Sequence, residues 1–358
     1  MTFSQRSFHL GHHRSLDGLR GVAILLVLIV HGEILLTSSY GFIGVNTFFV
    51  LSGFLITCLL IQEYDKSNDI SLRYFYIRRA LRLLPALITM LLVFVAVAFL
   101  SDPRKKAFQE LYEALRALFY FTNWAQIFSI GQTSSLAHTW SLSIEEQFYF
   151  IWPVLLLFLL RKNSRNSLLS WVLLGVFLSV ATRILLFLGT NTVSNPDRLA
   201  VGWDTRADSL FLGCYVGILV SSKLLPNWKW FAKALKISAM ISCVGLLMIG
   251  IFHTNAPWMI CIGWFLASVF AAILIAHFGS ASSGLLHRFF ENPILVYIGK
   301  ISYGLYIWHF PILMFMRQHQ LPWQHLMYLP PVFLVVLASY YLIEKPFLRL
   351  KDRFARVH

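Results

Sequence analysis

Two ionisable side chains on one apolar stretch suggest chemistry inside a membrane. Ten residues separate Arg20 from His31 in SLDGLRGVAILLVLIVHG (15–32), and all ten are uncharged. On an α-helix the two side chains lie about 16 Å apart along the axis and can project from one face. Ionisable groups at such depth are expensive unless they are partnered or wet, so they are candidates for function. One helix could hold the charged end of a long ligand at Arg20 and place its other end near His31. The structural alternative for His31 is a satisfied hydrogen bond between helices.

A second candidate site is the basic run YIRRALRLLPAL, which contains Arg78, Arg79 and Arg82. Such clusters often only anchor a helix to lipid head groups. Guanidinium forks also suit phosphate oxygens. Together with Arg20, the cluster could therefore form an anion site on the cytoplasmic side.

Acidic and further polar groups lie toward the opposite side of the membrane. In AHTWSLSIEEQFYFIWP, the uncharged run after Glu146 is too short to cross alone, so we expect the helix to begin earlier and to draw Glu145 or Glu146 into the outer boundary. The alternative is a carboxylate that caps the helix. For the remaining polar residues of the spans, a structural ion pair or a core histidine is the simpler interpretation; these are Arg183, Asp204, Arg206, Asp208 and His309.

The elements that must position these groups are membrane helices. The chain is 58% hydrophobic and 13% charged, with a mean hydropathy of +0.67, whereas soluble domains carry about 25% charged residues. We predict an all-α bundle with about ten crossings. The predicted crossings are 21–37, 42–62, 84–101, 143–160, 168–189, 207–222, 237–253, 257–277, 301–317 and 326–344.

The charge distribution orients these crossings. With both termini in the cytoplasm, 22 of the 30 Lys and Arg residues fall on the inner side, as membrane proteins prefer. The same preference explains the net charge of +14 without nucleic-acid binding. The segment 102–142 is predicted to be amphipathic or re-entrant rather than an eleventh crossing. The four cysteines lie in apolar runs without C-x-x-C pairs, so no metal site is predicted.

Five sequence blocks in order resemble the acyltransferase 3 family of bacterial polytopic membrane O-acyltransferases. The blocks are LDGLRG, FFVLSGFLIT, RRALRLLPAL, WSLSIEEQFYFIWP and ISYGLYIWHFPI, and EKP at Glu344 ends the similarity. The resemblance implies an acyltransferase domain over 16–346, between cytoplasmic tails at 1–15 and 347–358. Some family members continue into an esterase-like domain, whereas this chain stops 12 residues after Pro346.

The resemblance assigns roles to the candidate residues. It implies that His31 is catalytic, that the family's carboxylate falls on Glu145 and that Arg20, Arg78, Arg79 and Arg82 bind the donor. Many members have R-x-R in the arginine motif, whereas Leu81 stands at the second of those positions here. The expected supporting or acceptor-side residues are Asp17, Ser52, Trp140, Asp208, Tyr303 and His309.

The implied reaction moves an acyl group, usually acetyl from acetyl-CoA, to a hydroxyl of an extracytoplasmic glycan. Acetyl-CoA would be a co-substrate, with no permanently bound cofactor. Imidazole can accept a proton from an alcohol at neutral pH, and Glu145 or, as its rival, His309 could orient it. The sequence leaves open whether His31 is a general base or carries the acyl group.

The resemblance also implies a cellular setting. The expected location is the bacterial inner membrane, with the lipid bilayer as surroundings. The acceptor is either the glycan itself or a separate periplasmic protein that passes the acyl group on. A transporter of an anionic substrate is the alternative function, since it too would place ionisable groups within a bundle.

Overall fold

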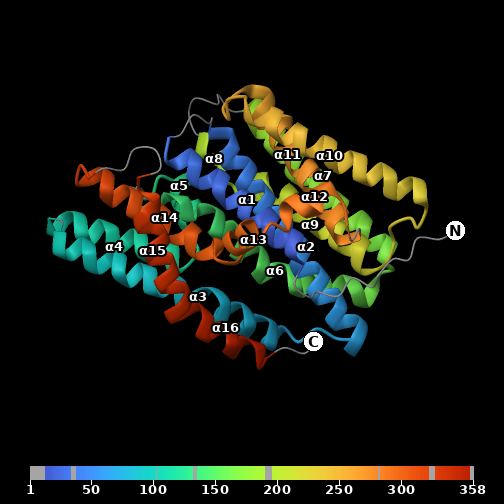
Figure 1. Cartoon of the computed structure of the whole chain (residues 1–358), viewed down its shortest axis with the longest axis horizontal. Coiled ribbons are helices and arrows are strands. Elements are labelled where there is room, and N and C mark those ends of the chain that lie inside the picture. Colours follow the sequence, from blue (N-terminus) through green and yellow to red (C-terminus); the bar gives the residue numbers. More distant parts are fainter. Residues whose placement is uncertain are drawn as a thin grey trace.

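The computed structural model is a bundle of helices (Figure 1). It describes residues 13–33, 38–101, 103–131, 135–189, 196–280, 283–321 and 327–354. Every regular element in these ranges is helical, so the predicted all-α class is confirmed. Most of the predicted N-terminal tail, the end of the first predicted crossing at 34–37 and the last residues of the C-terminal tail lie outside the described residues.

Ten helices of the described chain follow the apolar runs of the sequence. They are α1 (Arg14–His31), α2 (Ser38–Ser67), α3 (Leu72–Ser101), α6 (Trp140–Lys162), α7 (Arg165–Gly189), α9 (Trp203–Ser221), α10 (Lys229–Gly250), α11 (Trp264–Ser280), α14 (Ser302–Gln318) and α15 (Leu329–Ser339). The other helices are α4 (Arg104–Leu118), α5 (Thr122–Ile127), α8 (Pro196–Ala200), α12 (Leu285–Phe290), α13 (Pro293–Lys300) and α16 (Lys345–Asp352). A 3₁₀ turn, η1 (Ala137–Thr139), precedes α6, and π-helical turns η2 (Met259–Gly263) and η3 (Tyr340–Glu344) adjoin α11 and α15. Helix α15 reaches membrane length only together with η3 and α16, which continue it.

Seven helical segments of the described chain are long and apolar enough to cross a membrane. Each of the ten predicted crossings overlaps a long helix, but α1, α9 and α14 do not meet this standard. Helices α1 and α9 are excluded because each contains three charged residues, and α14 is excluded because its 17 residues are too few. Seven membrane-length helices make this a multi-pass membrane protein, while the count of ten stays a prediction.

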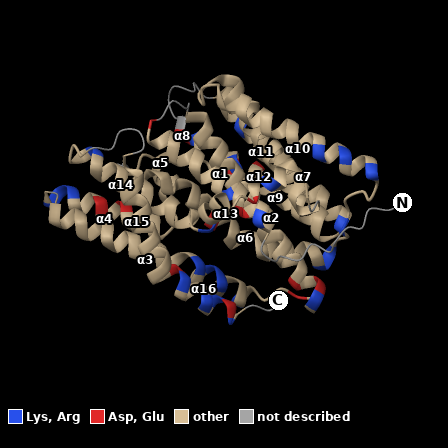
Figure 2. Ribbon diagram, in the orientation of Figure 1, with Lys and Arg blue, Asp and Glu red and all other residues tan. Residues whose placement is uncertain are grey.

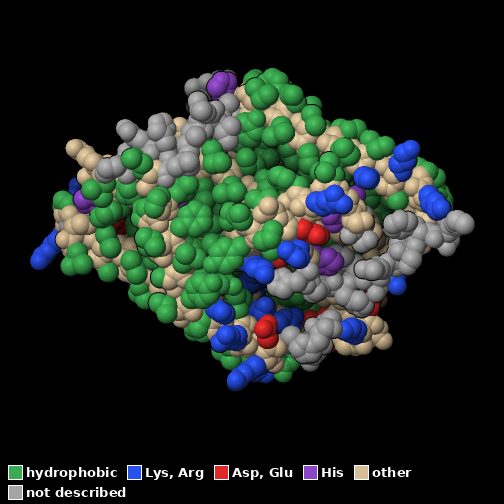
Figure 3. Space-filling model, viewed as in Figure 1, with side chains coloured by type: hydrophobic (Ala, Val, Ile, Leu, Met, Phe, Trp, Pro, Cys, Tyr) green, Lys and Arg blue, Asp and Glu red, His purple; other side chains and the backbone are tan. Residues whose placement is uncertain are grey.

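The surface matches a membrane setting. Hydrophobic side chains cover much of the face in Figure 3, whereas most of its Lys and Arg gather toward the lower right. Figure 2 shows basic residues at the end where α2 finishes, α10 begins and α16 lies. Along α10 the large apolar side chains point outward; exposed ones are Ile241, Val244, Leu247 and Met248. A lipid-facing helix would carry this pattern.

The segment between α3 and α6 forms no additional crossing within its described part. Helix α4 has 15 residues and α5 has 6, both too short to span a bilayer. The turn between them is held against α6, because the Gln147 amide donates to the carbonyl oxygen of Tyr120 at 2.8 Å and to Asn123 Oδ1 at 3.0 Å. Whether this segment is amphipathic or re-entrant stays a prediction.

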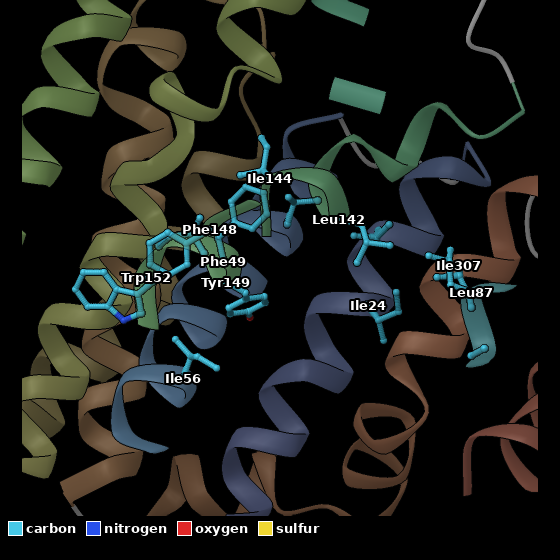
Figure 4. Close-up of a cluster of buried hydrophobic side chains, with 14 of the residues drawn as sticks. Ile24, Phe49, Ile56, Leu87, Leu142, Ile144, Phe148, Tyr149, Trp152 and Ile307 are labelled. Carbon is cyan, nitrogen blue, oxygen red and sulfur yellow. The ribbon is translucent and has the colours of Figure 1, made fainter. Parts of the chain in front are cut away.

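The core joins the two halves of the chain around α1, α2 and α6. Figure 4 shows side chains from α1, α2, α3, α6 and α14 in one cluster, including Ile24, Phe49, Leu87, Phe148 and Ile307. The indole of Trp152 donates to Thr57 Oγ1 at 2.9 Å, which satisfies the buried polar end of that large ring. The cluster fixes α6 against α2, and thereby the heights of the polar groups on both helices.

Glycines allow α2 and α9 to touch along their backbones. A methyl group at Gly53 would lie 2.0 Å from the carbonyl oxygen of Leu210, and one at Gly213 would lie 2.1 Å from that of Val50. Small residues permit such close helix packing in membranes.

Replacing Gly53 with alanine should therefore destabilise the protein. Because both backbones must move apart, we expect a loss of about 1–3 kcal/mol, typical of overpacking. The measurement is the midpoint of thermal unfolding in detergent. Gly189→Ala is the matched control, since a methyl group there meets no atom within 4 Å. Equal midpoints for the two variants would contradict this account of the α2 and α9 contact.

Candidate active site

Helix α1 carries the two groups that the sequence singled out. Arg20 lies in its second turn and His31 is its last residue. The separation of eleven residues corresponds to a rise of about 16 Å. Around each of them, the fold collects further polar groups from distant parts of the chain, and these groups form two clusters.

The first cluster contains three histidines, His31, His138 and His309. His31 Nδ1 lies 3.0 Å from the carbonyl oxygen of Val27 and 3.3 Å from His309 Nε2. The ring of His138 is centred 5.3 Å from that of His309. Phe310 contacts both His31 and His138, at 5.0 and 5.1 Å between ring centres.

Backbone carbonyls determine which nitrogen of His31 is basic. His309 Nδ1 lies 3.0 Å from the carbonyl oxygen of Leu305 and 2.7 Å from that of Tyr306. Carbonyl oxygens only accept, so in the neutral ring this nitrogen carries the hydrogen and His309 Nε2 is an acceptor. His31 Nδ1 must then supply the hydrogen of the contact with His309. His31 Nε2 consequently carries a lone pair, which is the form that can take a proton.

His138, which the sequence analysis did not select, completes the cluster. It lies in η1, two residues before Trp140, and is 5% exposed. The hydroxyl of Tyr306 donates to its carbonyl oxygen at 2.6 Å, so α14 holds this turn in place. The sequence offered one signal for His138, its position just before an apolar helix. Its spacing to the other candidate residues follows no recognisable pattern.

The second cluster, the arginine cluster, contains Arg20, Arg78, Arg79 and Arg82, and most of these arginines lie beside a carboxylate. The Arg79 guanidinium donates to Glu146 Oε1 from Nη2 at 2.9 Å and from Nε at 3.2 Å, and it lies 3.5 Å from the centre of the Tyr149 ring. Arg78 forms a salt bridge of 3.0 Å with Glu63. Arg20 lies 3.5 Å from Asp17. These carboxylates reduce the capacity of Arg78 and Arg79 to hold an anion.

Arg82 differs from its neighbours. Its side chain is exposed, and in the described part of the chain it makes no hydrogen bond or salt bridge. Arg20 and Arg79 are nonetheless close enough to interact with it electrostatically. An accessible guanidinium that forms no salt bridge among the described residues and has two further guanidinium groups nearby is suited to bind an anionic ligand.

Glu145 lies in the arginine cluster. It accepts a short hydrogen bond from the Ser52 hydroxyl, and the nearby charges are those of Arg20, Arg79 and Glu146. Among the described residues, the hydrogen-bond partners of the His31 ring are Val27 and His309. The structure therefore places His309, the rival partner, beside His31, whereas Glu145, the first-choice partner, is hydrogen-bonded to Ser52 in the arginine cluster.

The remaining predicted site residues have structural partners. Asp208 accepts from both terminal nitrogens of Arg183 at 3.1 Å, and both side chains are buried. Trp140 packs against Phe42 and Phe49. The Tyr303 hydroxyl donates to the carbonyl oxygen of Leu83 at 2.9 Å. Asp208 thus forms the structural ion pair that was the simpler interpretation of its sequence context.

Comparison with known proteins identifies the family. A model of the acyltransferase domain, acyltransferase 3, matches residues 13–344. The chain belongs to the acyltransferase 3 family. The resemblance stated from the five sequence blocks is confirmed, as is the predicted enzyme class, an acyltransferase, for the matched domain. In this acyltransferase 3 chain, both polar clusters lie within the matched range.

Curated relatives carry names of one activity. The chain is 34% identical over 351 residues to the peptidoglycan O-acetyltransferase OatA of Listeria monocytogenes, covering 93% of this chain and 55% of that protein. It is 32% identical over 353 residues to the O-acetyltransferase OatA of Staphylococcus aureus, covering 92% and 56%. The chain therefore spans about half the length of the curated relatives that it matches. No solved structure gives a significant match.

Proposed function

We propose that this protein is a membrane O-acetyltransferase that moves an acetyl group from cytoplasmic acetyl-CoA to a hydroxyl of an extracytoplasmic glycan. The names of the OatA relatives support the reaction and the glycan acceptor. The observation that carries the proposal is the arrangement on α1. Arg20, near the start of this helix, belongs to the arginine cluster, and His31, at its end, belongs to the histidine cluster and carries a lone pair on Nε2.

The donor side is the arginine cluster. A CoA nucleotide is too charged to enter lipid, so its phosphates stay at Arg82 and Arg20 while the thin pantetheine arm extends toward His31. This orientation is supported by the basic residues that lie where α2 finishes, where α10 begins and along α16 (Figure 2). The same bias supports ten crossings, cytoplasmic termini and placement in the inner membrane.

The chemical step requires one base. The oxygen of the acceptor hydroxyl attacks the thioester carbonyl carbon while His31 Nε2 takes the hydroxyl proton. The tetrahedral intermediate then collapses, the bond from carbon to sulfur breaks, and the thiolate receives the proton from the imidazolium. The products are the acetyl ester and free CoA. His309 keeps the His31 ring oriented throughout, as a positioning residue.

The direct test is acetyl transfer by the purified full chain in proteoliposomes. Labelled acetyl-CoA is supplied on one side and cell-wall glycan on the other, and the glycan is analysed by mass spectrometry. The expected result is acetyl ester on the glycan and an equal amount of free CoA. Movement of a solute without ester formation would favour the transporter alternative.

Arg82→Gln should weaken donor binding selectively. Removing a hydrogen bond to a charged group costs about 1.5–3 kcal/mol, so we expect KM for acetyl-CoA to rise roughly 10- to 100-fold. Initial rates at varied acetyl-CoA give this value. Glu145→Gln should change KM less, and Arg161→Gln is the control because its pair with Asp69 is exposed. The same KM for the Arg82 and Arg161 variants would contradict a donor site at Arg82.

A further inference from the structure

The ring of His138 is a buried polar group whose bonding is incomplete. Neither ring nitrogen has a hydrogen-bond partner in the described part of the chain, which omits residues 132–134. Leaving a buried polar group unsatisfied costs about 1–3 kcal/mol, so its missing partner requires an explanation. The turn that carries it is fixed, since Thr139 Oγ1 donates to the carbonyl oxygen of Leu136 at 2.8 Å and lies within hydrogen-bond distance of Thr122 Oγ1, at 2.9 Å.

The neighbours of the ring show which kind of partner is missing. The carbonyl oxygens of Tyr306 and Ile307 lie beside it without a hydrogen bond of normal geometry. That of Ile307 lacks its usual helical donor, because Pro311 stands four residues later and has no N–H. Both carbonyls can only accept, so only the nitrogen that carries the hydrogen in a neutral His138 ring could use them. The nitrogen that carries the lone pair has no hydrogen-bond donor among the described residues.

The missing partner must therefore donate a hydrogen, and its place is beside the reactive histidine. Phe310 packs against the rings of both His31 and His138, and His309 contacts both as well. An alcohol that attacks the thioester gives its one hydroxyl hydrogen to His31. It has no second hydrogen for His138, so the donor to His138 is a different hydroxyl of the same acceptor.

We propose that His138 binds a second hydroxyl of the acceptor while His31 activates the first. The acceptor class is then a molecule with two neighbouring hydroxyls, as sugars have, and Phe310 forms the wall between the two imidazoles. This inference rests on the proposed function and adds a binding site for the acceptor. His138 accepts a hydrogen bond here and transfers no proton.

Two small alcohols that differ by one hydroxyl test the site. The probes are trans-cyclohexane-1,2-diol and cyclohexanol, supplied with acetyl-CoA to the full chain in detergent, with cell-wall glycan as a third acceptor. We expect the wild type to favour the diol at least about tenfold in kcat/KM. His138→Phe should lower the preference to about twofold, the statistical value for two equivalent hydroxyls, and should lower glycan acetylation about 10²-fold. KM for acetyl-CoA should stay within about threefold of wild type.

Two further variants separate binding from folding. His138→Gln keeps an acceptor oxygen and should recover part of the diol preference. His277→Phe alters another buried histidine outside the cluster, at the last turn of α11, and should keep the full preference. An unchanged diol preference in folded His138→Phe overturns the proposal. So does a wild type that acetylates the glycan but does not favour the diol. A wild type that acetylates no acceptor would instead refute the proposed function.

Discussion

Replacing His31 with alanine should lower acetyl transfer to the glycan by about 10⁴-fold, the upper range of a general base. The variant loses the Nε2 lone pair that takes the hydroxyl proton in the proposed mechanism, and no second basic group of the cluster lies in the same position. KM for acetyl-CoA should change little, because the proposed site of the donor phosphates lies about 16 Å away at the other end of α1. Labelled ester on reconstituted glycan is the measurement.

The control for this variant is His319→Ala. His319 is an exposed histidine that stacks on Phe315, at the end of α14 and outside the cluster. It should retain wild-type transfer and wild-type thermal stability in detergent. Full acetylation by folded His31→Ala protein would refute the mechanism, and so would loss of donor binding together with loss of transfer.

Replacing His309 with phenylalanine should lower kcat by about 10²-fold. A wrong histidine tautomer costs a serine protease triad about 10⁴-fold, and we expect less here because His309 carries no charge and the carbonyl oxygen of Val27 still accepts from His31 Nδ1 at 3.0 Å. Without the second acceptor at 3.3 Å, the ring of His31 is held less firmly and the tautomer with the hydrogen on Nε2, which blocks the base, becomes more populated. The fully buried site keeps an aromatic ring of similar size, so the fold should survive.

The matched variant is His309→Gln, which restores an acceptor oxygen. It should recover about tenfold of the lost kcat, whereas a purely structural role would favour phenylalanine for its shape. Steady-state rates with saturating acetyl-CoA separate kcat from KM. Equal activities of the Gln and Phe variants would show that the tautomer of His31 does not depend on His309.

The arginine motif shows the limit of interpreting a sequence block as one site. Arg78, Arg79 and Arg82 stand together in the chain and were predicted to act together. In the structure, Glu63 and Glu146 pair with the first two, and Arg82 alone is left accessible and unpaired among the described residues. The carboxylates come from α2 and α6, and no local pattern indicates which arginine each would reach.

The π-helical turn η3 is a second place where the structure shows a contact that the sequence did not predict. Glu344 was predicted only as the end of the similarity and of the last crossing. Its carboxylate is buried, and a methyl group at Gly304 of α14 would lie 2.8 Å from its Oε1. The helical segment continues past Glu344 to Asp352, and the sequence did not indicate that this carboxylate enters the core.

The sequence by itself determined the helical membrane class, the acyltransferase 3 family and the spacing of Arg20 and His31. These depend on hydropathy and helix geometry, which act over neighbouring residues. Only the tertiary structure decided that His309, 278 residues away, is the partner of His31 and that His138 stands beside them. The tertiary structure also decided that Glu145 accepts a hydrogen bond from the Ser52 hydroxyl. Such contacts depend on how α1, α6 and α14 pack, and side-chain packing between distant segments leaves no periodic signal in the sequence.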